Sequence, residues 1–317
     1  MGSEQPAPVE LRGLVKRYGE IVAVDHVDLT VDRGDVFGYL GPNGAGKTTS
    51  LRIMLGLIRP SAGSARLFGR DPLIHGAKAL EGVAGFVEAP RFYPYLSGRR
   101  NLRLLADYDE PVSRARIDAV LELVELRDRA KDRVGGYSHG MRQRLGIAAA
   151  LLRAPRLLLL DEPTTGLDPA GMRDMRELVR RLAGEGITIL LSSHLLHEVE
   201  ELCNRVAIIR RGAIVYQGQL RDLLNRAAST YRLNALEPER AHRLLLAQPG
   251  IVEVRLDGAA LRFSADEESV AALTVALGQA RIAFTALVPE TATLEELFLG
   301  MTDGESSDHD RPVALAV

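Results

Sequence analysis

The stretch that decides the fold is Gly41-Pro42-Asn43-Gly44-Ala45-Gly46-Lys47-Thr48-Thr49. Its spacing fits the pattern G-x-x-x-x-G-K-[ST], in which glycines let successive backbone N–H groups point at one phosphate. Residues 36–40 (VFGYL) predict a short buried strand before it, and residues 48–57 (TTSLRIMLGL) carry apolar side chains at helical spacing after it. A strand, a glycine loop and a helix in this order predict a site for the phosphates of a nucleotide.

Three side chains of this phosphate loop (residues 41–49) have distinct expected roles. Lys47 is expected to neutralise the β- and γ-phosphates, and the Thr48 hydroxyl is expected to reach Mg²⁺. Thr49 adds a second hydroxyl near the α-phosphate. The loop alone indicates a nucleotide and leaves kinases, GTPases and transport ATPases open.

Composition bounds the class of protein. The 317 residues, 46% hydrophobic and 26% charged, are typical of a soluble chain of roughly two domains. The net charge of −2 gives no sign of a nucleic-acid partner, and the single Cys203 fits a reducing cytosol. The N-terminus lacks the apolar segment of a secretory signal, and the longest apolar runs are too short to cross a bilayer. Any membrane part is therefore expected on another chain.

Two adjacent carboxylates follow an apolar run. Residues 156–160 (RLLLL) predict a buried strand that ends at Asp161 and Glu162. Ligands of α/β sheets bind at the carboxyl ends of strands, so Asp161 is expected to hold Mg²⁺ through water and Glu162 to act as base for an attacking water. Without the phosphate loop, a solvated acidic turn would be the simpler interpretation.

His194 follows the next predicted strand, residues 187–191. A lone histidine is usually structural, but here we expect a phosphate sensor.

Two further features are weaker by themselves. Ser138-His139-Gly140-Met141 opens a predicted helix, and such a start leaves backbone N–H groups available to an anion, although most such serines are plain helix caps. Tyr18 precedes the phosphate loop and is expected either to stack on adenine or to be an ordinary tyrosine of an edge strand.

In combination and in this order, these residues resemble the ATP-binding subunit of an ABC transporter over residues 9–218. The resemblance identifies the phosphate loop as Walker A, residues 157–161 as Walker B, Glu162 as the catalytic glutamate, Leu167 and Asp168 as the D-loop, His194 as the switch histidine, Tyr18 as the adenine-stacking residue, and residues 138–141 as the signature. It also implies the cofactors ATP and Mg²⁺.

The chain departs from the family pattern at two places. Its signature reads Tyr-Ser-His-Gly-Met where Leu-Ser-Gly-Gly-Gln is usual, and Glu88 stands where the family often has glutamine. The kept serine and glycine are the parts expected to meet a γ-phosphate, and Glu88 is expected to accept a water or approach Mg²⁺. Together with residues 92–98 (FYPYLSG), both departures resemble the subgroup that drives bacterial antibiotic, multidrug and lipid-type exporters.

The resemblance implies a fold, an assembly and a location. The fold is an α/β P-loop NTPase core with an antiparallel β subdomain and a helical subdomain at about residues 89–154. Two ATP molecules lie between two head-to-tail protomers, most simply identical chains, and hydrolysis drives export through separate transmembrane permease subunits. The protein is then peripheral, at the cytoplasmic face of the membrane, with no nucleic-acid partner.

Outside residues 9–218 the chain carries no nucleotide motif. We expect a disordered leader at 1–8, a linker at 219–229, a C-terminal domain at 230–302 and a disordered tail at 303–317. The strand and helix order βαββαβ predicts a small α+β ferredoxin-like domain, with a last short helix at residues 293–299. It shows no ligand constellation, so a packing or dimer-stabilising role is expected.

Two alternatives stay open at this point. Some importer ATPases carry a regulatory C-terminal domain, although Glu88 argues against that class. Soluble ABC ATPases that act on ribosomes usually have two cassettes in one chain, and this chain has one. DNA-repair types insert long coiled coils before the signature, and the segment between Lys47 and Ser138 is too short for them.

Overall fold

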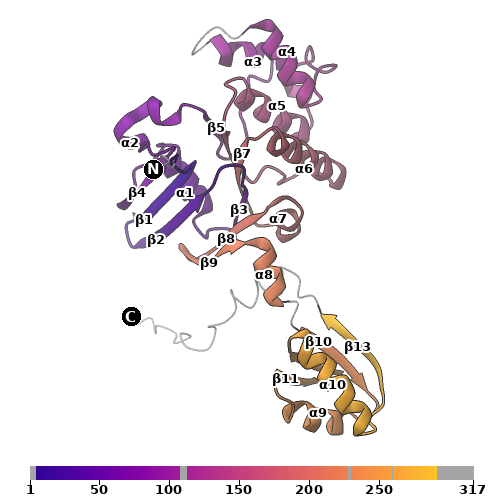
Figure 1. The fold of residues 1–317 in the computed structure, drawn as a ribbon. Helices are drawn as coiled ribbons and strands as arrows, with labels where there is room; N and C mark the ends of the chain where they lie inside the picture. The colour runs from indigo at the N-terminus through magenta and orange to yellow at the C-terminus, as the bar shows by residue number, and fades with distance from the viewer. Residues whose placement is uncertain (1–4, 108–112, 228–229, 259, 291–317) are drawn as a thin grey trace, which may run out of the picture. The chain divides into compact units, whose positions relative to one another are not determined.

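The computed structural model describes residues 5–107, 113–227, 230–258 and 260–290. The chain divides into two compact units, Met1–Gln219 and Leu220–Val317 (Figure 1). The division falls within residues 219–229, the stretch expected as a linker. Each unit has its own core.

The first unit is built on a six-stranded sheet in the order β5-β6-β7-β3-β8-β9. Its strands are β3 (Val36–Leu40), β5 (Val83–Phe86), β6 (Leu157–Asp161), β7 (Thr188–Ser193), β8 (Arg205–Arg210) and β9 (Ala213–Gln219). All pairings are parallel except that of the edge strand β9. β6 and β7 are buried along their whole length, and both carry unbroken apolar runs, residues 157–160 and 189–191, because both of their faces are covered. The carboxyl ends of the parallel strands share one edge, where the predicted site residues follow β3, β6 and β7.

Helices connect these strands, and two further helices form the helical part. The connecting helices are α1 (Lys47–Met54), α5 (His139–Leu151), α6 (Pro169–Gly184) and α7 (Leu196–Leu202), and the helical part adds α3 (Gly98–Asp107) and α4 (Arg114–Leu123) (Figure 1). α7 packs closely on β3, since a Cβ at Gly38 would lie 2.8 Å from the Val199 side chain. That contact requires glycine in the strand.

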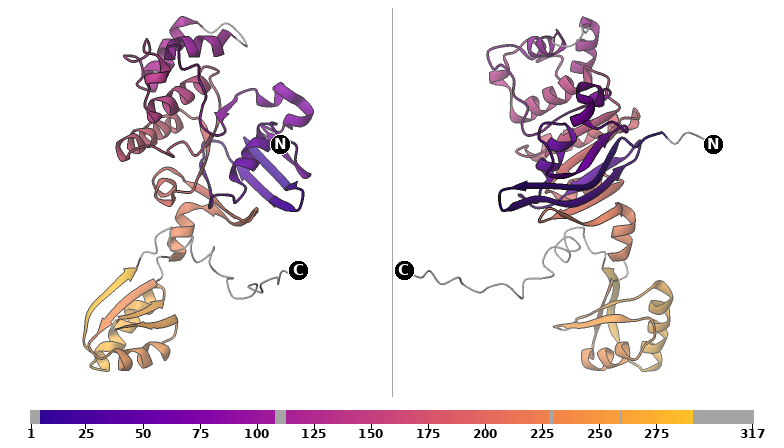
Figure 2. Two further views of the ribbon diagram at one scale, coloured as in Figure 1. Left: turned by 180° about the vertical axis from the view of Figure 1, so that it is seen from behind. Right: turned by 90° about the vertical axis from the view of Figure 1, so that its left-hand side faces the viewer.

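An antiparallel sheet completes the first unit. It has the order β2-β1-β4, with β1 (Val9–Tyr18), β2 (Ile21–Val31) and β4 (Ala62–Leu67). Alternate apolar residues of β1 and β2 join the core around Phe37 and Tyr39 of β3. Figure 2 shows this sheet on one side of the six-stranded sheet, with α5 and α6 on the other. The expected α/β core with an antiparallel part and a helical part is confirmed.

The second unit begins with α8 (Leu220–Ala227) and continues as an antiparallel sheet with two helices. Its elements are β10 (Thr230–Ala235), α9 (Pro238–Leu246), β11 (Val252–Asp257), β12 (Ala260–Ser264), α10 (Glu267–Gln279) and β13 (Phe284–Glu290), and the sheet order is β11-β12-β10-β13. The core gathers around Leu233, Leu261 and Phe263. The elements follow one another as βαββαβ; the ferredoxin-like assignment stays a prediction, and the expected helix at 293–299 lies outside the described residues.

The structure differs from the sequence-based expectation in several places. It adds α2 (Pro72–His75), a 3-10 helix (Gly76–Leu80), α7, β8 and β9, none of which the sequence analysis assigned. Of the expected disordered leader, residues 5–8 contact the antiparallel sheet and its neighbours: the Pro8 carbonyl accepts a hydrogen bond from Phe68 N–H at 3.2 Å. In the part of the chain that is described, no helix has the length and apolar character needed to span a bilayer.

Candidate functional site

The phosphate loop joins β3 to α1 as predicted. Gly44 and Gly46 have φ values of 80° and 108°, which favour glycine. A Cβ at Gly46 would also lie 2.3 Å from the carbonyl oxygen of Ala23, so any larger residue would push the loop away from β2. α1 begins at Lys47, which places the unpaired N–H groups of its first turn beside the loop. The loop therefore has the backbone geometry of a phosphate site.

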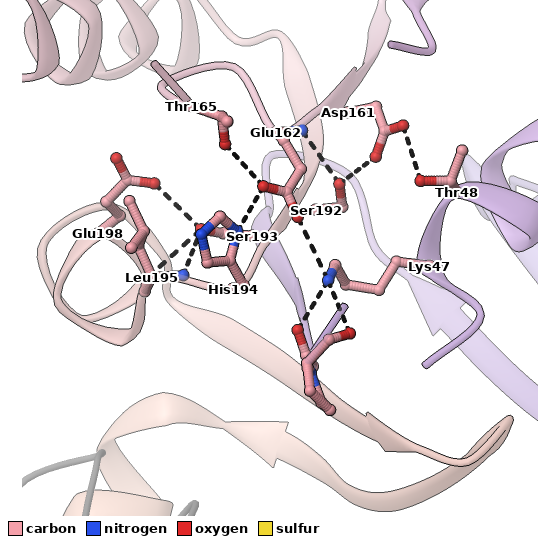
Figure 3. A network of polar contacts seen from close by, with 12 residues as sticks. Lys47, Thr48, Asp161, Glu162, Thr165, Ser192, Ser193, His194, Leu195 and Glu198 are labelled. Atoms are coloured by element: carbon pink, nitrogen blue, oxygen red, sulfur yellow. Dashed lines mark hydrogen bonds and ion pairs between the residues drawn. The ribbon is translucent and has the colours of Figure 1, made fainter. Parts of the chain in front are cut away.

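Lys47 ties this loop to the end of β6. Its side chain is only 5% exposed, and Nζ donates hydrogen bonds to the carbonyl oxygens of Gly41 (2.7 Å) and Pro42 (3.2 Å). The same Nζ lies 3.3 Å from Glu162 Oε1 (Figure 3). The ammonium and the carboxylate therefore share one site, although the two residues are 115 positions apart in the chain. Both were predicted to act on the same phosphate.

Asp161 meets Thr48 as expected for a pair of Mg²⁺ ligands. The Thr48 hydroxyl donates to Asp161 Oδ2 at 3.0 Å, and the Ser192 hydroxyl donates to Oδ1 at 2.5 Å. Strand register places Ser192 of β7 directly beside Asp161 of β6. A hydroxyl and a carboxylate are oxygen donors of the kind that Mg²⁺ prefers, so these residues fit the expected ion.

Glu162 is held in an unusual backbone conformation. Its φ of 49° lies in the left-handed region, which a non-glycine residue adopts only where its surroundings hold it. The Glu162 N–H lies 3.2 Å from the carbonyl oxygen of Ser192 and 3.1 Å from its hydroxyl oxygen. The side-chain Oε2 accepts a hydrogen bond from Thr165 Oγ1 at 2.7 Å and lies 2.5 Å from His194 Nδ1 (Figure 3). The structure thus brings Glu162 and His194 together, with Thr165 as a third member.

The surroundings of Glu162 set its protonation state. Burial is the largest influence and raises the pKa of its carboxyl. The hydrogen bond from Thr165 and the charges of Lys47 and His194 lower that pKa, and together they prevail over burial. The pKa therefore lies below the usual range for glutamate. At neutral pH the group is a carboxylate, the form in which it can accept a proton.

One prediction follows from the contact with Thr165. Thr165→Val removes a hydrogen bond that favours the charged form, so the pKa of Glu162 should rise. Because kcat/KM reports the free enzyme, the acid limb of its pH profile should move to higher pH. Thr165→Ser keeps the hydroxyl and is the matched control. An acid limb that stays in place in Thr165→Val would contradict the assignment of Glu162 as base.

Glu88 reaches this site with its main chain. Its N–H donates to Asp161 Oδ2 at 3.3 Å, while its carboxylate forms an ion pair with Arg52 of α1. The residue has a φ of 65°, in the left-handed region. The structure does not bring the Glu88 carboxylate to Thr48 and Asp161, and a role of that carboxylate at Mg²⁺ stays a prediction.

The signature residues lie at a separate cleft. Ser138 caps α5 by accepting a hydrogen bond from Met141 N–H at 3.2 Å, as in the simpler interpretation. A cleft of about 450 Å³ is lined by residues 138–141 together with Gly166, Leu167 and Asp168, and by no residue of the phosphate loop. Signature and D-loop are thus neighbours within one chain. Their contact with ATP of a second protomer stays a prediction.

Tyr18 ends β1 and is 47% exposed. The Lys16 ammonium lies 4.9 Å from the ring centroid, so one face of the ring has a cation over it. The exposure suits a stacking residue, and adenine stacking stays a prediction.

Sequence reasoning missed three residues that complete the site. Thr165 and Ser192 donate hydrogen bonds to Glu162 and Asp161, and Ser193 precedes His194. Signals existed for all three: hydroxyl residues stand three positions after Glu162 and at the carboxyl end of β7.

Comparison with known proteins places this constellation in a family. The sequence profile described as "ABC transporter" matches residues 24–165. The ABC transporter ATP-binding protein YhcH of Bacillus subtilis (strain 168) is 38% identical over 306 residues, which cover 95% of this chain and 97% of that protein. The bacitracin transport ATP-binding protein BcrA of Enterococcus faecalis is 32% identical over 93% of this chain and 96% of its own.

A solved structure agrees with the fold and the chemistry. It is a dimeric ATP-binding cassette in a post-hydrolysis state bound to ADP and Pi, 25% identical, with a TM-score of 0.60 over 67% of this chain and 98% of that one. Full-length similarity to YhcH, the phosphate loop and the convergence of Lys47, Asp161 and Glu162 all lead to one assignment. The chain belongs to the ABC transporter family: it is the ATP-binding subunit of such a transporter, an ABC ATPase.

Proposed function

We propose that this ATPase binds two ATP molecules at the interface of a head-to-tail dimer and drives export of a drug, antibiotic or lipid-like substrate through separate membrane subunits. The observation that carries the proposal is the contact of one carboxylate, Glu162, with Lys47, Thr165 and His194. In the proposal, Glu162 is the base, Lys47 the phosphate-binding cation and His194 the phosphate sensor, and all three would act on the same phosphate.

The residues divide the chemistry among them. The phosphate loop and Lys47 would bind and orient the β- and γ-phosphates, and Thr48 with Asp161 would hold Mg²⁺, which supplies charge neutralisation when bound. A γ-phosphate near Lys47 competes with the Glu162 carboxylate for the ammonium, which lies 3.3 Å away. Released from that contact, Glu162 would accept the proton of the attacking water while His194 keeps its other oxygen oriented.

The cleft at the start of α5 supports the dimeric arrangement. Ser138 and Gly140 stand at a helix N-terminus, where N–H groups favour an anion. In the proposed dimer this end closes over ATP held by the phosphate loop of the partner. ATP favours the closed dimer because it contacts both protomers there, and hydrolysis removes the bridging phosphate and reopens it. Two copies of this chain suffice for both sites.

A groove beside the site suits a membrane partner. It measures about 690 Å³ and is lined chiefly by apolar residues of β5, α3, α5 and the loop after Glu88, among them Phe86, Pro90, Phe92, Leu105 and Gly146. α5 touches this loop closely, since a Cβ at Gly146 would lie 2.4 Å from the Pro90 ring. In the proposal a segment of the permease occupies this groove, which places the ATPase at the cytoplasmic face of the membrane.

The class of substrate rests on relatives and on two departures from the family pattern. BcrA is named for bacitracin transport and is similar along nearly the whole chain. Glu88 and the signature residues Ser138-His139-Gly140-Met141 resemble the exporter subgroup. Both favour export of an antibiotic or a similar amphiphile.

The test is the identity of the partner. Glu162→Gln, purified from detergent-solubilised cells with ATP present, should bring down a polytopic membrane protein. Leu105→Glu, which places a charge in the groove, should lose that partner and keep its own ATP hydrolysis. Leu104→Glu is the matched control, because Leu104 is also exposed but does not line the groove. Ribosomal proteins or DNA in place of a membrane protein would overturn the proposal.

A further inference from the structure

A buried carboxylate lies behind the switch histidine. Glu198, in the first turn of α7, is only 3% exposed. Its Oε2 accepts a hydrogen bond from the Ser193 hydroxyl at 3.1 Å, and its Oε1 has no hydrogen-bond partner among the described residues (Figure 3). A buried carboxylate with one unsatisfied oxygen costs stability, so packing alone does not explain glutamate at this position.

Ser193 connects this carboxylate to the turn that carries His194. Its hydroxyl oxygen accepts a hydrogen bond from Leu195 N–H at 2.9 Å, two residues along the chain, which closes a serine turn around His194. Its carbonyl oxygen accepts a hydrogen bond from Gly41 N–H at 3.3 Å, at the start of the phosphate loop. His194 thus stands between two anchored neighbours, and one anchor depends on the direction of the Ser193 hydroxyl.

Glu198 fixes that direction. A serine hydroxyl has a single proton, and Glu198 Oε2 at 3.1 Å is the nearer of its two acceptors, the other being the Leu195 carbonyl oxygen at 3.4 Å. Donating the proton to Glu198 leaves a lone pair aimed at Leu195 N–H. α7 itself cannot shift easily, because Val199 packs against Gly38 of β3 with no room for a Cβ between them. The carboxylate is therefore a fixed reference point, set by the packing of α7 on the central strand.

We propose that Glu198 is a positioning residue for ATP hydrolysis, acting through Ser193 to hold His194 Nδ1 at 2.5 Å from Glu162 Oε2. This inference rests on the proposed roles of Glu162 and His194. It explains why a side chain with an oxygen that has no partner among the described residues is buried on α7, one position before Val199. An apolar residue would suffice for packing but could not orient the hydroxyl.

The test separates orientation from packing. Glu198→Leu keeps an apolar volume without an acceptor, and kcat should fall about 10- to 100-fold, as for a catalytic group displaced by about an ångström. The KM for ATP and the melting temperature should stay close to wild type. Glu198→Gln keeps an oxygen acceptor and should retain kcat within about threefold. Glu201→Leu is the matched control on α7; it loses ion pairs with Arg176 and Arg180, so only its melting temperature should fall.

A double-mutant cycle with His194→Ala shows whether Glu198 affects hydrolysis through His194. If Glu198 acts through His194, then Glu198→Leu and Ser193→Ala should each lower kcat in the wild-type background and add nothing once His194 is alanine. Equal further losses in the His194→Ala background, or a kcat that only follows the melting temperature, would overturn the inference; if Glu198→Leu does not fold, Ser193→Ala decides. An active Glu162→Gln would instead refute the proposed function, which distinguishes the two failures.

Discussion

The variant Glu162→Gln is expected to bind ATP normally and to hydrolyse it about 10²–10⁴-fold more slowly, the usual range for loss of a general base. The amide has nearly the same shape, and its oxygen can still accept the hydrogen bond from Thr165. It cannot accept a proton from water at neutral pH. Steady-state hydrolysis and equilibrium dialysis of ATP measure the two effects separately.

The control for this substitution is Glu177→Gln on the exposed face of α6, which should leave both quantities unchanged. A normal rate of hydrolysis in Glu162→Gln would show that another group takes the proton. A loss of ATP binding would show that the substitution disturbs the phosphate loop through Lys47 instead.

Lys47→Ala should weaken nucleotide binding itself. Lys47 is the buried cation of the phosphate loop, and truncating one partner of a buried charged contact costs about 2–4 kcal/mol. That range corresponds to about a 30- to 700-fold higher Kd. The change also leaves the Glu162 carboxylate without its nearest cation. Equilibrium dialysis with ATP is the measurement, and Lys131→Ala, an exposed lysine far along the chain, is the control. A Kd within threefold of wild type would contradict the assignment of the loop.

The fold around the phosphate loop could be predicted because local patterns dictate it. The strand predicted at residues 36–40 is β3 with the same bounds, since a short apolar run before glycines leaves little choice. α1 ends at Met54, three residues before its predicted end, because Gly56 takes a φ of 69° and the chain turns there. The sequence signalled that stop only as one glycine in an apolar segment.

The sequence also predicted that the main site residues lie close together. Asp161 and His194 follow parallel strands, whose carboxyl ends share an edge, so their proximity to the phosphate loop follows from strand order. Contacts set by individual turns could not be predicted. Thr165 reaches Glu162 through the left-handed turn at Glu162, and no periodicity reports such a conformation.

Contacts between residues far apart in the chain also could not be predicted from the sequence. Glu88 pairs with Arg52, which stands 36 positions earlier on α1, and this pair turns the carboxylate away from the place where the family pattern suggested it. β8 lies between β3 and the edge strand β9 in the sheet. Its short apolar run could not be distinguished, from the sequence, from a buried helical segment.

The hydrogen bond from Glu88 N–H to the Asp161 carboxylate brings the ATP site within a few residues of the groove. Glu88 N–H touches the carboxylate of Asp161, and two residues later Pro90 abuts Gly146 of α5 and lines the groove. The loop therefore contacts Asp161 at one end and α5 at the other. In the proposed complex, residues 88–90 connect Asp161 to a permease segment in the groove through three residues of main chain, so we expect a displacement of Asp161 to be passed directly to that segment.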